Sequence, residues 1–284
     1  MKLASFQIAD RPSWGVVTED SVIDVGRALG QRLPDLRAVI ASRAYADIEQ
    51  ALTQAPRHRF AAVDWLPVVP KPDKIICVGL NYDEHRRETG RSRAGYPVIF
   101  ARFASSQTGH LRPVLLSHLS TQLDYEGELA VVIGRPGRYI PRQDAFSYVA
   151  GYSCYNDFSV RDWQYHTHQF SPGKNFPGTG AFGPWLVTPD ELGPYEKLRL
   201  ETRVNGAVVQ SATFDQMIFD VPQLVEYCSN FTQLEPGDVI VTGTPGGIGA
   251  KRQPPLWLKP GDVTEVEIER IGTLRNTIAS EHRN

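Results

Sequence analysis

The chain has 284 residues, and its 30 Lys and Arg nearly balance its 32 Asp and Glu, which leaves a formal net charge of -2. A chain of this length can bury one large core, or a main core and a small one. The balance provides no basic field for nucleic acid, and no run approaches the roughly 20 apolar residues needed to span a bilayer. The three cysteines lack metal or redox spacing. We therefore expect a soluble cytoplasmic protein without nucleic-acid or membrane partners.

The first part of the chain predicts a small α+β unit, because short apolar runs separated by a polar turn precede a helical pattern. The expected elements are strands at 1–7, 14–17 and 22–25 and helices within 33–54. The proline-rich stretch from Leu66 to Asp73 ends this unit, since proline can neither continue a helix nor donate to a strand ladder. We predict an N-terminal domain over 1–69 and a second domain over 70–284.

The second domain is predicted to be mainly β. Short runs of β-branched residues recur between turns that contain Gly and Pro, and few long helices separate them. The expected strands are 75–78, 129–133, 199–204, 239–242 and 264–268. Two Pro-Gly-Asp turns, at 236–238 and 260–262, repeat one chemistry, in which Pro fixes φ and Gly takes a positive φ.

The clearest helix is predicted at 221–231. Asp220 can cap its first turn, and Gln223 completes a capping box. The side chains expected to pack on the sheet are Leu224, Cys228 and Phe231.

The most informative stretch is 124–134, which begins with three acids and continues as a strand. Since strand side chains alternate between faces, Asp124, Glu126 and Glu128 are expected to share one face. Like charges entering a core repel one another unless a cation compensates them. A further carboxylate, Asp157, ends another apolar segment. These residues alone fit either a solvated strand end or a site for Mg²⁺, Mn²⁺ or Ca²⁺, which prefer oxygen ligands.

Six segments carry a family resemblance that extends from Lys74 to the C-terminus. They are Val78-Gly-Leu-Asn-Tyr-Asp-Glu-His85, Asp124-Tyr-Glu-Gly-Glu-Leu-Ala-Val-Val-Ile-Gly134, Tyr155-Asn-Asp-Phe-Ser-Val-Arg-Asp162, Gly173-Lys-Asn-Phe176, Asn205-Gly206 and Pro236-Gly-Asp-Val-Ile-Val-Thr-Gly-Thr-Pro245. In this order and register, the chain resembles the fumarylacetoacetate hydrolase family. The resemblance implies an α+β fold that is mainly β, a mixed β-sandwich roll after a small α+β unit, and a homodimer.

The resemblance also implies roles for single residues. Glu126, Glu128 and Asp157 match the metal ligands of the family, with Mg²⁺ or Mn²⁺ as the expected ion and Ca²⁺ as an alternative. His85 and Glu88 match a lid dyad that activates water. At i and i+3 of a short helix they share one face, and a carboxylate can orient an imidazole. Without the resemblance, a surface helix with an ion-pairing Glu explains the same residues.

Four more residues match positions around the substrate. Lys174 resembles a lysine beside the metal that stabilises developing negative charge, although an isolated Gly-Lys usually lies in a surface loop. Arg161 and Gln164 match substrate contacts, and Thr244 matches a hydroxyl at the pocket floor. Arg161 has a surface ion pair as its alternative.

Two departures limit this transfer. Asn175 stands where the family often has Ser, and the acidic residue that often follows the lysine motif is absent. Arg102 stands where many relatives carry Lys, and its bidentate fork suggests a carboxylate partner, either substrate or structural.

The predicted function is metal-dependent hydrolysis of a C–C bond in an acylpyruvate or related 2,4-dioxo acid, which releases pyruvate and a carboxylic acid. One alternative uses the same enolate chemistry for decarboxylation or isomerisation of an oxaloacetate-like or unsaturated oxo acid. A second alternative is a non-catalytic metal-binding scaffold. The expected ligand is a small oxo acid whose identity the sequence leaves open.

Overall fold

The structure, a computed structural model, describes residues 1–281, so the last three residues of the predicted 70–284 domain lie outside it. The N-terminal part contains the predicted strands and helices. Its elements are β1 (Lys2–Ile8), β2 (Arg11–Val17), β3 (Ser21–Ile23), α1 (Val25–Leu29), α2 (Leu36–Ser42), α3 (Tyr45–Ala51), β4 (Arg57–Arg59) and β5 (Asp64–Trp65). The side chains of Asp24 and Asp35 cap α1 and α2 by accepting hydrogen bonds from backbone N–H groups of the first turn.

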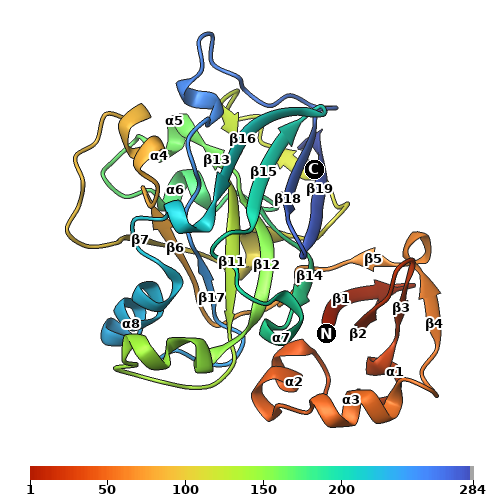
Figure 1. Ribbon diagram of the computed structural model, residues 1–284. Coiled ribbons are helices and arrows are strands. Elements are labelled where there is room, and N and C mark those ends of the chain that lie inside the picture. The colour runs from red at the N-terminus through yellow and green to blue at the C-terminus, as the bar shows by residue number, and fades with distance from the viewer. Residues whose placement is uncertain (282–284) are drawn as a thin grey trace.

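A large sheet joins this part to the rest of the chain. Its other strands are β6 (Ile75–Gly79), β7 (Val98–Arg102), β8 (Gln107–Thr108), β11 (Gly127–Ile133), β12 (Val149–Asp157), β14 (Gly180–Val187) and β17 (Val239–Val241). The main path is β4-β3-β2-β1-β14-β12-β11-β17-β6-β7. Because β1 pairs antiparallel with β14, the two predicted domains share one sheet, and in Figure 1 the N-terminal strands extend from the edge of the main body. The boundary at residue 70 stays a prediction.

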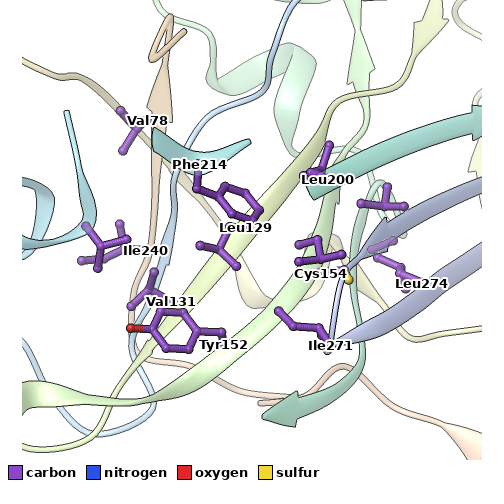
Figure 2. Close-up of a cluster of buried hydrophobic side chains, with 14 of the residues drawn as sticks. Val78, Leu129, Val131, Tyr152, Cys154, Leu200, Phe214, Ile240, Ile271 and Leu274 are labelled. Carbon is purple, nitrogen blue, oxygen red and sulfur yellow. The ribbon is translucent and has the colours of Figure 1, made fainter. Parts of the chain in front are cut away.

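A second, five-stranded sheet packs on one face of β11 and β12. It runs in the order β16-β15-β18-β19-β9. Its strands are β9 (Val114–Leu116), β15 (Arg199–Val204), β16 (Ala207–Thr213), β18 (Val263–Ile268) and β19 (Gly272–Ser280). Figure 2 shows Leu129, Val131 and Cys154 in one cluster with Leu200 and Leu274 of this second sheet.

The opposite face of β11 is also buried. Ala130 and Val132 pack with residues of the N-terminal helices, among them Val39 and Ile40 of α2. Burial on both faces explains why 129–133 is a continuous apolar run rather than an alternating one. The predicted α+β class, mainly β and built as a mixed sandwich, is confirmed.

Short helices occupy the connections between strands. They are α4 (Asp83–Glu88), α5 (Arg161–Gln164), α6 (Ser171–Lys174), α7 (Pro189–Leu192) and α8 (Val221–Phe231). The predicted capping box at Asp220 and Gln223 begins α8. The predicted sheet-facing side of α8 is wrong for Phe231, the last residue of the helix, which is 52% exposed and packs on Tyr227. Among the described residues, no helix is both long and apolar enough to cross a membrane.

The two repeated turns have the same local structure, as predicted. Gly237 and Gly261 take positive φ values of 86° and 93°. In each turn the following aspartate accepts a hydrogen bond from a backbone N–H three residues earlier, at 2.7 Å for Asp238 and 2.8 Å for Asp262. The first turn leads into β17, which lies beside β11.

Candidate active site

Three buried carboxylates meet where β11 begins and β12 ends. Glu126 immediately precedes β11, Glu128 lies within it, and Asp157 is the last residue of β12. The antiparallel register pairs Glu128 with Tyr155, and the Asp157 N–H donates to the Glu126 carbonyl at 2.9 Å. One oxygen from each carboxylate lies within 4.8 Å of the other two, so this acid triad could hold a metal ion.

Asp124 does not belong to the triad, although it was predicted to share a face with Glu126 and Glu128, and it reaches Glu126 only through Arg161, which donates to both. The strand is interrupted at 125–126, and Asp124 lies in the short strand β10 (Leu123–Asp124), which pairs with β13 (Ser159–Val160) in a separate ladder. Its carboxylate accepts hydrogen bonds from the backbone N–H groups of Gly249 and Ala250, at 2.8 and 3.0 Å. Asp124 therefore anchors the loop after β17.

Lys174, the last residue of α6, supplies a positive charge to the triad. Its Nζ donates to Glu126 Oε2 at 2.6 Å and to Asp157 Oδ2 at 2.7 Å. The preceding Gly173 is required, because a Cβ there would lie 2.4 Å from the backbone nitrogen of Gln164 in α5. Close packing of α6 on α5 thus sets the position of Lys174, which is buried rather than in a surface loop.

Two buried arginines complete the charge network. Arg161 donates from Nε to Asp124 at 2.9 Å, from Nη2 to Glu126 at 2.6 Å and from Nη1 to Gln164 Oε1 at 2.8 Å. The surface-pair alternative for Arg161 is therefore wrong. Arg102 pairs with Asp157, which settles the question that its sequence position left open: its carboxylate partner is structural.

The network contains four carboxylates and three cations, which leaves one net negative charge when all are ionised. Burial alone would raise the pKa of Glu126, but Arg161 and Lys174 lower it to about 2. Burial, together with the neighbouring Asp157 and Glu126 carboxylates, raises the pKa of Glu128 well above its ordinary value. Glu128 is therefore the carboxylate of the network without a matching cation, and a hard divalent ion bound to these oxygen donors would supply one.

The dyad at His85 and Glu88 lies on α4, as predicted. His85 Nδ1 and Glu88 Oε1 are 2.7 Å apart, and Glu88 Oε2 accepts from the Gly247 N–H at 2.9 Å. The chain before α4 is fixed because Asn81 Nδ2 donates to the Phe219 carbonyl at 2.9 Å. His85 is only 5% exposed, so the alternative of a surface histidine is wrong.

A cavity of about 140 Å³ connects these groups. Besides Glu126 and Glu128, the predicted site residues that line it are His85, Arg161, Gln164, Lys174 and Thr244. Glu88 and Asp157 lie outside the lining, and each contacts a residue that does line it. Thr244 Oγ1 donates to the Gly127 carbonyl at 3.0 Å and accepts from Gln210 Nε2 at 2.8 Å, which fixes its hydroxyl.

Some lining residues were not predicted as site residues. Phe100 lies on β7 next to Lys174, whose Nζ is 5.0 Å from the ring centre. Lys251 ends the 3₁₀ helix η5 (Gly249–Lys251), and Arg91 follows α4. Phe100, Arg91 and Lys251 belong to no motif with a recognisable spacing. They come together only in the folded chain.

Comparison with known proteins assigns the family. Residues 74–279 match the family described as "Fumarylacetoacetate (FAA) hydrolase C-terminal". The chain belongs to the fumarylacetoacetate hydrolase family. It is 42% identical over 228 residues to "Oxaloacetate tautomerase FAHD2A, mitochondrial" of Bos taurus, a match that covers 80% of this chain and 73% of the relative.

Solved structures share the fold of the whole chain. "Fumarylacetoacetate hydrolase (EaFAH)" of Exiguobacterium antarcticum is 38% identical, with a TM-score of 0.87 over 99% of this chain and 100% of that one. Maleylpyruvate hydrolase from Sphingobium sp. SYK-6, solved with manganese(II) and pyruvate, is 28% identical, with a TM-score of 0.83 over 99% and 100%. The family is enzymatic, while the individual residue roles, the cytoplasmic location and the homodimer stay predictions.

Proposed function

We propose that this protein is a divalent-metal-dependent enzyme that interconverts the keto and enol forms of oxaloacetate. The observation that carries the proposal is the buried acid triad with Lys174 at the floor of a small cavity. The similarity to a protein named oxaloacetate tautomerase supports the substrate, and the manganese in a homologous structure supports the metal. The proposal therefore favours the isomerase alternative over the hydrolase that the sequence predicted.

The reaction moves one proton from C3 of oxaloacetate and places another on the C2 carbonyl oxygen, so no atom is added or lost. A divalent ion held by Glu126, Glu128 and Asp157 would act as a Lewis acid toward the oxo-carboxylate end. His85 lines the cavity and is the group placed to accept the C3 proton, while Glu88 orients its imidazole and stabilises the positive charge.

Lys174 is the residue placed to stabilise charge on the carbonyl oxygen. Its ammonium group has three N–H donors, of which Glu126 and Asp157 take two. Burial alone would lower the pKa of Lys174, but Asp157 and Glu126 raise it, so the amine is cationic at neutral pH. The third donor can face the substrate, where a charge-assisted hydrogen bond stabilises developing negative charge.

The cavity size also supports a small substrate. Pockets for drug-sized ligands usually hold about 300 to 1,000 Å³, whereas this cavity holds about 140 Å³. A four-carbon acid fits this limit better than an acylpyruvate with a long acyl group.

Hydrolysis of a small acylpyruvate is the second candidate, and the dyad is the observation that favours it. A buried imidazole paired with a carboxylate can activate water as well as remove a proton from carbon. In that reaction water adds to the 4-carbonyl, the C3–C4 bond breaks, and pyruvate and a carboxylic acid leave.

The test uses metal-stripped protein with and without Mn²⁺, and three readouts distinguish the reactions. Absorbance of enol-oxaloacetate reports tautomerisation, pyruvate from a short acylpyruvate reports hydrolysis, and carbon dioxide from oxaloacetate reports decarboxylation. We expect metal-dependent loss of the enol signal without carbon dioxide, and we expect His85→Gln to reduce it at least 100-fold, the range of general-base catalysis. Pyruvate from the acylpyruvate alone would favour the hydrolase. Failure of all three readouts would favour the non-catalytic scaffold.

A further inference from the structure

The mouth of the cavity carries two positive charges that the proposed mechanism does not use. Arg91 and Lys251 both line the cavity and are both exposed. Within residues 1–281, neither side chain forms an ion pair, whereas every cation at the floor pairs with at least one carboxylate. The charged side chains at the floor are therefore largely paired with one another, whereas the two cations at the mouth have no carboxylate partner among the described residues.

The floor of the site fixes the backbone of Lys251. The two residues before it in η5, Gly249 and Ala250, donate their N–H groups to Asp124, and Asp124 accepts from Arg161. Arg161 in turn donates to Glu126 of the acid triad. A chain of hydrogen bonds thus connects the position of Lys251 to the predicted metal ligands.

Arg91 lines the cavity from the segment that follows the predicted lid helix. Its backbone N–H donates to the Arg86 carbonyl at 3.2 Å, and its own carbonyl accepts from Arg86 Nη1 at 2.9 Å. Its guanidinium carbon lies 5.5 Å from the ring centre of Phe170, which also lines the cavity. Stacking on an aromatic ring limits the freedom of the guanidinium group while leaving its N–H donors available.

We propose that Arg91 and Lys251 bind the second carboxylate of a dicarboxylic 2-oxo acid whose oxo-carboxylate end lies over the acid triad. Arg can hold a carboxylate with two parallel N–H donors, and Lys adds a point charge. An apolar tail at the mouth would instead desolvate two cations without pairing them. The inference rests on the proposed function, because it takes the orientation of the substrate from the metal and Lys174.

The test compares two ligands that differ only in the second carboxylate. Isothermal titration measures binding of pyruvate and of oxaloacetate to the full chain loaded with Mn²⁺. For the wild type we expect tighter binding of oxaloacetate. Arg91→Gln and Lys251→Met should each weaken oxaloacetate binding about tenfold, the size expected for a hydrogen bond to a charged group, and leave pyruvate unchanged. Arg138→Gln, which removes an exposed cation stacked on Tyr139, is the matched control.

The outcomes separate this inference from the proposed function. Equal binding of the two ligands by the wild type, or equal weakening of both ligands in the variants, overturns the inference while tautomerase activity can stand. Tighter binding of oxaloacetate that both variants abolish supports the inference even when the enol assay shows no turnover, a result that would refute the tautomerase alone. Binding of neither ligand in the presence of Mn²⁺ overturns both.

Discussion

Replacing Lys174 with Met should destabilise the folded protein, because it removes a cation that pairs with two buried carboxylates. The ammonium group is buried and donates to both Glu126 and Asp157. Removing it leaves four carboxylates facing only Arg102 and Arg161, so the net charge changes from one negative to two. Breaking a buried ion pair by deleting one partner costs about 3 to 5 kcal/mol. Since domains have roughly 5 to 15 kcal/mol of stability, the metal-free variant should unfold at clearly lower urea.

Metal should reduce this loss of stability. A ligand at 100 times its Kd stabilises the folded state by about 2.7 kcal/mol. The variant no longer places an ammonium group beside the acid triad, so its affinity for Mn²⁺ should rise, and the difference in the free energy of unfolding between variant and wild type should shrink when Mn²⁺ is added. Enol-oxaloacetate turnover should stay low in the variant, because the hydrogen bond to the carbonyl oxygen is missing.

The assay is urea unfolding of both proteins, metal-stripped and in excess Mn²⁺. Lys197→Met is the control, since Lys197 pairs with Asp215 at the surface and should leave the midpoint unchanged. A Lys174→Met protein as stable as the wild type without metal would refute the idea that Lys174 compensates the buried carboxylates. A stability difference that Mn²⁺ leaves unchanged would refute the idea that the ammonium group of Lys174 weakens metal binding at the triad.

Two further predictions concern the scaffold around the site. Burial and Arg275 lower the pKa of His110 to about 4, so between pH 6.5 and 4 the unfolded chain binds a proton that the folded chain does not, and stability falls as pH falls. The full shift corresponds to about 3 kcal/mol, reduced to about 1 to 2 by solvent screening. In urea unfolding, the free energy of unfolding should fall less between pH 7 and pH 4.5 for His110→Asn than for the wild type. Equal losses in the two proteins would show that His110 is not the source of the pH dependence. Gly127→Ala should destabilise the fold by about 1 to 3 kcal/mol and weaken Mn²⁺ binding, because the added Cβ would lie 2.0 Å from Thr202 Oγ1 in the facing sheet. Gly95→Ala, where a Cβ meets nothing within 4 Å, is the control, and equal melting temperatures for the two variants would contradict the packing argument.

The sequence predicts local structure well where periodicity and turn chemistry act within a few residues. The capping box at Asp220 and the positive φ of Gly237 and Gly261 follow from residues adjacent in the chain. The apolar run at 129–133 predicts a buried strand, and both faces of that strand are buried in the structure. These features need no knowledge of distant partners.

Other features depend on contacts between distant segments, which no local pattern reports. The pairing of β1 with β14 joins residues more than 180 apart. Asp124 follows the same alternation as Glu126 and Glu128, but pairing with β13 and Arg161 takes it into a separate ladder. The choice of Asp157 as the partner of Arg102 likewise requires β7 and β12 to be placed in three dimensions.

The site residues were assigned from motifs, and the structure brings them into one place for physical reasons. Glu126 and Glu128 flank Gly127, where an added Cβ would lie 2.0 Å from Thr202 Oγ1 of the facing sheet. His85 and Glu88 share a helical face, as the i and i+3 spacing predicts. The charge at the mouth could not be read in this way, because Arg91 and Lys251 lie in separate segments that only the folded chain brings to one cavity.

The central claim is that a divalent ion held by the acid triad supports tautomerisation of oxaloacetate. The most direct test is the rate of enol-oxaloacetate loss as a function of Mn²⁺ concentration, for metal-stripped wild type and Glu128→Gln. Glu128 lines the cavity and accepts the Gly243 N–H, so Gln should keep this hydrogen bond while removing a carboxylate that can bind the ion. We predict a saturable rise in rate whose midpoint shifts at least tenfold to higher Mn²⁺ concentration in the variant. A rate that does not depend on Mn²⁺ concentration, or equal midpoints for the wild type and Glu128→Gln, would contradict a metal-dependent tautomerase.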